Sequence, residues 1–245
     1  MNFNLKKYTD GTYSRMMVYL IGVLSVLLIM GFLLSGCNLE NVAGGQNENE
    51  NENDNVSVAM KVSQSDNPSN TLSLSEAKFL ITEVYFRRPD NTEGEVRIAP
   101  VVVYLDLTGR VTVATSGSIP AGTYNRLRFK VHKVEDFETV PDPDFKEGTS
   151  GSKRYSVIAK GSFNGSSFVY KSRKSINMEM TFSNPVTISA GQKVNMTISL
   201  NPYSWFFANG DYINPSSSSN ENTIDDNIKS AFRHIFIDND LNGQP

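Results

Sequence analysis

The 245-residue chain contains a single cysteine, Cys37, and only two histidines, His132 and His234. A lone thiol cannot form an internal disulfide, which excludes a disulfide-stapled fold and a zinc site built from several thiolates. Neither histidine has a cysteine or carboxylate at the spacing of metal ligands. We expect His132 on the exposed face of a strand and His234 near a helix C-terminus, where it can interact with the helix dipole. The sequence also lacks a Gly-x-Ser-x-Gly elbow and a Gly-rich phosphate loop, so a protein that is not an enzyme is favoured over a hydrolase.

An excess of positive charge is also absent. The chain has 23 Lys and Arg against 26 Asp and Glu. Residues 1–36 hold three of the basic residues and one of the acidic ones, so the remainder carries a net charge of −5. Nucleic-acid binding depends on clustered Lys and Arg, and we therefore expect no nucleic-acid partner.

One long apolar run is present near the N-terminus. Residues 16–36 form a stretch of 21 residues without a charge, preceded by Lys6, Lys7 and Arg15. At about 1.5 Å per residue, a helix of this length can span a bilayer. Two interpretations remain open: a retained membrane anchor, or an apolar signal helix that is cleaved off.

The run ends in Leu34-Ser35-Gly36-Cys37, which resembles the lipobox of bacterial lipoproteins. The resemblance implies that residues 1–36 are a signal peptide cut between Gly36 and Cys37, and that the Cys37 sulfur receives a diacylglycerol. The new amino terminus is usually acylated as well, with fatty acids such as palmitate. Two or three acyl chains anchor a protein stably in a membrane. The implied location is the cell envelope, and in a Gram-negative host the outer membrane, on its periplasmic or surface face. An idle cysteine beside a membrane anchor is the alternative.

Residues 37–55 predict a disordered tether. Residues 46–55 alternate Asn or Gln with Glu or Asp and contain nothing apolar, so they cannot bury enough surface to fold. Repulsion among the carboxylates would extend the segment. A surface-export signal is one functional alternative. Calcium binding by this run is disfavoured, because a flexible tract offers no fixed coordination shell.

From Val56 to Pro245 the pattern predicts one mainly β domain. Apolar and polar residues alternate in several short runs, among them residues 56–62, 77–86 and 123–134, with a slip or bulge near Glu83. Asn164-Gly165 between two such runs indicates a tight hairpin. Eight to ten strands at this spacing favour an antiparallel β-sandwich of immunoglobulin-like or related type. Residues 135–153 are a long polar loop.

A helical pattern occurs once in the domain, at residues 223–236. Ile224, Ile228 and Phe232 recur at steps of four, Thr223 is suited to cap the start, and Asp225 falls in the first turn. We expect a C-terminal α-helix that packs on the sandwich.

Three stretches of the domain resemble a family of bacterial lipoprotein domains, the domain of unknown function 4382. They are residues 84–90 (VYFRRPD), Leu105-Asp106-Leu107, and residues 119–128, which contain Pro-Ala-Gly-Thr-Tyr. The resemblance covers residues 56–134 and implies a sandwich, of prealbumin-like type, without implying an activity. The Asp-Ala-Pro usual near the family's first strand is replaced by residues 66–68 (DNP).

Two groups of acidic residues are candidate sites. Asp238, Asp240 and Asn242 occupy the first, third and fifth positions of an EF-hand-like loop, with Gly243 at the sixth, and could form a weak calcium site. The Glu at the twelfth position is missing, and an Asx-rich turn is the alternative. Residues 142 and 144, both Asp, could form a carboxylate pair, although a Pro-rich loop more often only turns.

Aromatic residues gather before the predicted helix. Trp205, Phe207 and Tyr212 could form a platform for sugar rings, although aromatic residues of a β protein more often belong to the core. The sequence therefore favours a lipid-anchored protein with a binding or structural role. A carbohydrate- or calcium-linked module for uptake or adhesion is the alternative, with a glycan or an envelope protein as partner.

Overall fold

The computed structural model describes residues 53–63, 71–97, 99–149, 151–232 and 234–245, all in one structural unit. The predicted signal peptide, the two lipobox residues Gly36 and Cys37, and most of the predicted tether lie outside these residues. Among the described residues, no helix is both long and apolar enough to cross a membrane.

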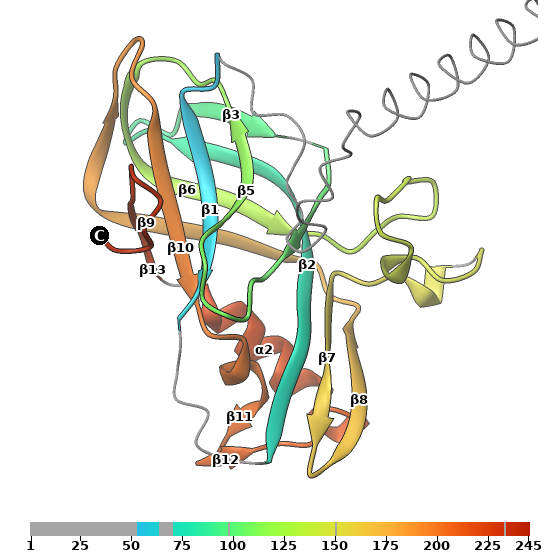
Figure 1. The fold of residues 1–245 in the computed structure, drawn as a ribbon. Coiled ribbons are helices and arrows are strands. Elements are labelled where there is room, and N and C mark those ends of the chain that lie inside the picture. The colour runs from blue at the N-terminus through green and yellow to red at the C-terminus, as the bar shows by residue number, and fades with distance from the viewer. Residues whose placement is uncertain (1–52, 64–70, 98, 150, 233) are drawn as a thin grey trace, which may run out of the picture. The chain divides into compact units, whose positions relative to one another are not determined.

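The domain is mainly β, as the sequence predicts, and its strands form two larger sheets and a small hairpin (Figure 1). The strands are β1 (Val56–Val62), β2 (Leu72–Arg87), β3 (Glu93–Arg97), β4 (Val101–Tyr104), β5 (Thr112–Gly117), β6 (Gly122–Val131), β7 (Val157–Phe163), β8 (Ser166–Ser172), β9 (Ile176–Ile188), β10 (Val194–Leu200), β11 (Phe207–Ala208), β12 (Asp211–Tyr212) and β13 (His234–Ile237). Within the described residues, the helical elements are four 3-10 turns and one α-helix: η1 (Pro143–Phe145), η2 (Gly151–Lys153), η3 (Pro202–Phe206), η4 (Ser218–Asn220) and α2 (Glu221–Ala231).

The first sheet has the order β13-β10-β1-β5, and the second is built around the long strand β2, which pairs with β3, β4, β6 and β7. Strand β8 continues the second sheet beyond β7, and β9 continues it beyond β6. Every pair is antiparallel except β1 with β10, which is parallel. Strand β1 is buried along almost all its length because it lies between β10 and β5 and is covered on both faces.

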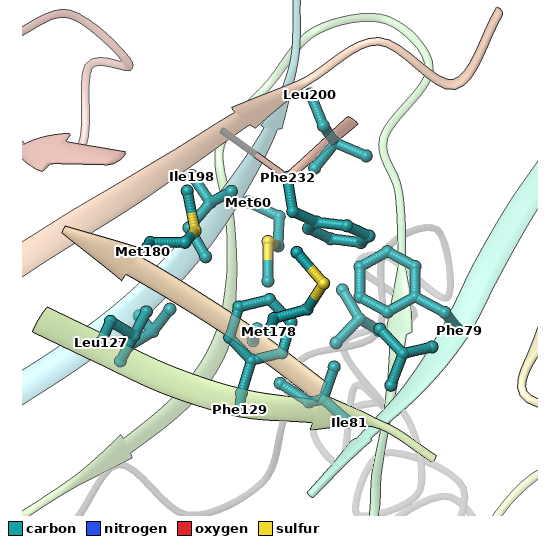
Figure 2. Packing of buried hydrophobic residues seen from close by; sticks show 14 of the residues in the cluster. Met60, Phe79, Ile81, Leu127, Phe129, Met178, Met180, Ile198, Leu200 and Phe232 are labelled. Carbon is teal, nitrogen blue, oxygen red and sulfur yellow. The ribbon is translucent and has the colours of Figure 1, made fainter. Parts of the chain in front are cut away.

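The main core lies between the two larger sheets (Figure 2). Met60 and Ile198 of the first sheet meet Phe129 and Met178 of the second, and each is at most 6% exposed. Phe232, directly after α2, inserts its ring against this group. Burial of apolar side chains at this density is the main stabilising contribution to such a domain.

Two local predictions are confirmed. Glu83 has a φ of 53°, and the pairing of β2 with β6 shifts register between Thr82 and Tyr85, which is the predicted bulge. Asn164 and Gly165, with φ of 49° and 77°, form the tight turn between β7 and β8. Both central residues of such a turn need positive φ, which Asn and Gly adopt most readily.

The predicted C-terminal helix is confirmed, but its boundaries 223–236 are wrong. Helix α2 begins at Glu221, its N-cap Asn220 makes no side-chain capping hydrogen bond, and its last residue is Ala231. Residues His234–Ile237 instead form β13, which pairs with β10. An edge position on β10 satisfies the backbone groups of this β-branched and aromatic segment, which outweighs its helical spacing.

The predicted tether also ends earlier than Asn55. The backbone N–H of Asn55 donates to the Gly117 carbonyl at 3.1 Å, and its side chain exchanges two hydrogen bonds with the backbone of Ile119. Asp54 accepts a hydrogen bond from Ser116. The last residues of the acidic run are therefore fixed to β5, because Asn55 extends the antiparallel pairing of β1 with β5 by one residue.

Candidate functional site

The most elaborate polar cluster of the described residues surrounds Lys78, in the middle of β2. Its side chain is only 4% exposed, and its Nζ lies 2.7 Å from Asp142 Oδ2, 2.8 Å from Asp144 Oδ2 and 3.0 Å from Glu76 Oε1. The Tyr104 hydroxyl donates a second hydrogen bond to Asp142 Oδ2 at 2.9 Å. We call these five residues the Lys78 cluster.

Strand register explains how the cluster forms. Lys78 pairs with Tyr104 of β4 on one side and with Ile158 of β7 on the other, while Glu76 pairs with Lys160. Paired residues share one face of a sheet, so these side chains all project on the face opposite the main core. The long loop then places its two aspartates over that face.

The carboxylates keep Lys78 positively charged. Burial alone would lower the pKa of Lys78, but its hydrogen bonds to Asp142, Asp144 and Glu76 outweigh burial and raise that pKa above the ordinary value. Burial likewise opposes ionisation of Asp142, yet its hydrogen bond from Lys78 and the Asp144 backbone N–H leave its pKa lowered. Lys78 and Asp142 are therefore both ionised at neutral pH.

The pKa values of two further members of the cluster are also shifted. The hydrogen bond from Lys160, followed by that from Lys78, lowers the pKa of Asp144 to about 2. Burial and the hydrogen bond to Asp142 raise the pKa of Tyr104 to about 12. Tyr104 is thus a stable hydrogen-bond donor over the physiological range.

The loop that carries the two aspartates is ordered, with a small core of its own. Phe145 packs in a second apolar cluster with Leu80 of β2 and Ile158 of β7, on the same face as Lys78. Arg154 is 1% exposed and donates to the carbonyls of Glu147, Lys153 and Gly148, which explains how this segment satisfies its backbone without a sheet.

A second buried carboxylate lies on the other side of β7 and β8. Asp225 of α2 is 2% exposed, and its Oδ1 accepts hydrogen bonds from the Tyr170 hydroxyl at 2.7 Å and the Ser172 hydroxyl at 2.6 Å. Lys174 Nζ lies 3.2 Å from Oδ2. These hydrogen bonds fix α2 to β8. The sequence pattern predicts only that Asp225 lies in the first turn of the helix, and does not predict its partners on β8.

Asp238, Asp240 and Asn242 form a turn rather than a cage for a cation. Asp238 is 2% exposed, and its carboxylate accepts hydrogen bonds from Thr197 Oγ1, from the Asn242 N–H and from the Gly243 N–H at 2.7–3.0 Å. Asp240 Oδ2 accepts from the Asn242 side chain. In the part of the chain that the structure describes, no three His, Cys, Asp or Glu side chains are grouped to hold a metal. The geometry favours the Asx-rich turn.

A platform that includes Trp205 is contradicted by the structure. Trp205 is fully buried, in contact with Phe206 in the main core, because η3 turns its ring towards the sheets. Phe207 is 46% exposed and packs edge-on against Tyr212 at 5.4 Å across the β11–β12 hairpin. Only this pair of the three predicted aromatic residues remains at the surface.

The predicted positions of both histidines are wrong. His132 is 6% exposed, directly after β6, and its Nε2 lies 2.7 Å from Glu138 Oε2. The long loop folds back over the strand end and covers the ring, which alternation within the strand could not reveal. His234 is exposed in β13, outside any helix.

Two of the stretches that resemble the lipoprotein family are neighbours in space. Tyr124 is fully buried and donates from its hydroxyl to the Pro120 carbonyl at 2.7 Å. The Arg88 guanidinium lies 5.1 Å from the Tyr124 ring and donates to the Ala121 carbonyl. A Cβ on Gly122 would lie 2.6 Å from Arg88, so this contact requires glycine. The motif therefore has a structural role at the start of β6.

The chain has little measurable similarity to known proteins. No protein-family model matches it, and no curated protein does. Among solved structures, MbnP from Methylosinus trichosporium is similar with 11% sequence identity and a TM-score of 0.37, over 66% of this chain and 76% of that one.

The sequence signals only part of the Lys78 cluster. Asp142 and Asp144 are identified as a carboxylate pair, but their partner Lys78 is not. A usable signal is the uninterrupted run Phe79-Leu80-Ile81 that follows it. Three consecutive apolar residues in a strand imply that both faces are covered, so a lysine beside them must find buried partners.

Proposed function

We propose that this protein is a bacterial lipoprotein, anchored through acyl chains on Cys37, whose β domain has a non-enzymatic binding or structural role at the cell envelope. The observation that carries the proposal is Leu34-Ser35-Gly36-Cys37, which holds the only cysteine of the chain and directly ends the apolar run of 21 residues. Asn38 follows the cysteine, and by resemblance to lipoproteins this favours the outer membrane over inner-membrane retention in a Gram-negative host.

The arrangement of the domain supports an anchored module. Strand β1 begins at Val56, so 18 residues (38–55) separate it from the proposed anchor. A fully extended chain of that length spans at most roughly 60 Å, and Asp54 and Asn55 use the last part of it to contact β5. The segment can therefore hold the β domain at a distance from a bilayer surface.

The anchor is tested by replacing the cysteine in the full chain. Cys37→Ala should abolish incorporation of labelled palmitate and leave an uncleaved precursor, because no thiol remains to receive the diacylglycerol. Ser35→Ala is the matched control: it keeps a small residue before the cut, and labelling should be normal. A Cys37→Ala protein that is cleaved and localised like the parent would rule out the lipoprotein proposal.

A glycan-binding role is the second candidate, and the pair of exposed Phe207 and half-buried Tyr212 favours it. Aromatic rings at a surface can stack against sugar rings, and the two rings cross at 79° on a short hairpin. A glycan array probed with the full chain in detergent tests this role. Binding that is lost in Phe207→Ala and retained in Val169→Ala, a 55% exposed apolar residue of β8, would support it. Equal binding by the two variants, or none by the parent, would contradict it.

A further inference from the structure

The Lys78 cluster brings a primary amine and a carboxyl group into contact inside the domain. Lys78 and Asp142 are 3% and 7% exposed, 64 positions apart in the sequence, and their Nζ and Oδ2 atoms are 2.7 Å apart. Further carboxylates and aromatic rings enclose the pair. We propose that Lys78 and Asp142 condense into an intramolecular amide bond that joins β2 covalently to the long loop.

The reaction needs no external reagent. The Lys78 ammonium gives a proton to a neighbouring carboxylate, and the free amine attacks Asp142 Cγ to form the N–C bond. The bond from Cγ to one carboxyl oxygen then breaks, and that oxygen leaves as water after taking up two protons that originated on the ammonium. The products are a neutral amide and one water molecule, so atoms and charges balance without an oxidant or a nucleotide.

The surrounding groups suit each step. Glu76 Oε1, at 3.0 Å from Nζ, is positioned to accept the ammonium proton. This transfer is required because the hydrogen bonds to Asp142, Asp144 and Glu76 hold the pKa of Lys78 above its ordinary value. General bases at hydrogen-bond distance of the nucleophile are the usual means of activating an amine.

The carboxyl group of Asp142 is held at both oxygens. Its Oδ1 accepts the backbone N–H of Asp144 at 2.9 Å, which can stabilise the negative charge that develops on that oxygen during attack. Its Oδ2 accepts the Tyr104 hydroxyl at 2.9 Å, a donor that can pass a proton to the leaving oxygen. Donors preorganised at both oxygens favour the addition step and the elimination step alike.

The environment favours the product. Burying a lysine–aspartate ion pair carries a large desolvation cost, and a neutral amide in the same place does not. The fully buried Phe145 ring, 5.8 Å from Nζ, limits the access of water that would reverse the reaction. A cross-link between such distant positions also restricts the unfolded chain, as a disulfide does in proteins with more than one cysteine.

Peptide mapping of the full chain, purified in detergent and digested with trypsin, tests the proposal. Without the cross-link, trypsin cuts after Lys78 and releases residues 62–78 and 134–146 as separate peptides. With it, Lys78 is blocked, and residues 62–87 appear joined to residues 134–146 with the mass of both peptides less one water. We expect this branched species, with fragment ions that place the branch at Lys78 and Asp142.

Two variants keep the test decisive. Lys78→Arg preserves the cation but cannot form the bond, so the branched species must disappear. Glu76→Gln keeps the reacting pair while removing one proton acceptor, and should form the bond more slowly after refolding. Near-ultraviolet circular dichroism verifies that each protein is folded. A folded parent chain that yields residues 62–78 and 134–146 entirely as free peptides would overturn the proposal.

Discussion

The long loop, residues 135–153, and the C-terminal segment, residues 201–232, cover opposite faces of the same two strands, β2 and β7. On the loop side, Leu80 and Ile158 belong to the small apolar cluster. On the other side, alternate residues such as Phe79 belong to the main core, which the C-terminal segment completes. Both segments are well ordered, yet they are attached by different interactions.

Before the proposed amide bond forms, the loop is held mainly by charge. Lys78, Arg154 and Lys146 each donate to several loop oxygens, those of Asp142 and Asp144 in the first case and backbone carbonyls in the other two. The C-terminal segment is held mainly by apolar side chains in the main core, together with the hydrogen-bonded carboxylate of Asp225. Electrostatic attachment depends on protonation states, whereas apolar burial does not, so the two segments should respond differently to mutation and to pH.

The largest effect is expected on the apolar side. Phe232→Ala removes a ring that lies 5.4 Å from the Phe79 ring and 5.5 Å from the Phe129 ring in the main core. The free energy of unfolding should fall by about 4 kcal/mol, from lost transfer energy and the remaining cavity. Urea denaturation measures this. Phe137→Ala, at a residue 87% exposed in the long loop, is the control and should change stability by less than about 0.5 kcal/mol. Equal losses of unfolding free energy in the two variants would contradict the placement of Phe232 in the main core.

Removing the ion pairs between Lys78 and the loop should lower the free energy of unfolding by less, and should affect mainly the loop. Relative to a parent chain without the proposed amide bond, Lys78→Met leaves the buried Asp142 carboxylate without its cation and should lower stability by about 3 kcal/mol. Hydrogen exchange should accelerate in residues 135–153 and remain unchanged in α2. Lys160→Met, at a 33% exposed lysine that contacts Asp144 of the cluster, is the matched control with a loss of about 0–1 kcal/mol. Faster exchange in α2 than in the loop would show that the two attachments are not independent.

The sequence predicts the apolar side of this comparison better than the charged side. Alternation identified the strands, and steps of four identified Ile224, Ile228 and Phe232 as one face of a helix, all three of which are buried. Local patterns could not reveal that the loop folds back over β2, because that contact depends on residues 64 positions apart. His132 is buried for a different reason: Glu138, only six positions away, folds back onto its ring, which alternation within the strand does not reveal.

The helix end shows a second limit. Ile235 and Phe236 continue the helical spacing, but β10 offers an unpaired edge to this segment, and pairing with it forms β13. The spacing of apolar residues within one segment does not reveal that a distant strand can pair with it. The aromatic residues near Trp205 show a third limit. Adjacent aromatic residues cannot be told apart from the sequence, but η3 points Trp205 into the core and leaves Phe207 at the surface.

The smallest predicted effect is on the pH dependence of stability. It distinguishes the long loop from the C-terminal segment without the removal of a core residue. Hydrogen bonds from Lys160 and Lys78 lower the pKa of Asp144 from 3.8 to about 2. A carboxyl group with a lowered pKa in the folded state stabilises the fold above its unfolded pKa. That stabilisation is present above pH 3.8 and is lost as the pH falls towards 2. Acidification across this window should therefore loosen the loop before α2.

Asp144→Asn should reduce the difference in unfolding midpoint between pH 6 and pH 3, because the variant has no carboxyl group to protonate there. Asp226→Asn, on the exposed side of α2, is the matched control and should keep the pH dependence of the parent chain. Urea midpoints at the two pH values measure both variants. The same slope in Asp144→Asn as in the parent would mean that other groups carry the acid sensitivity, and the loop would then be held chiefly by the packing of Phe145 against Leu80 and Ile158.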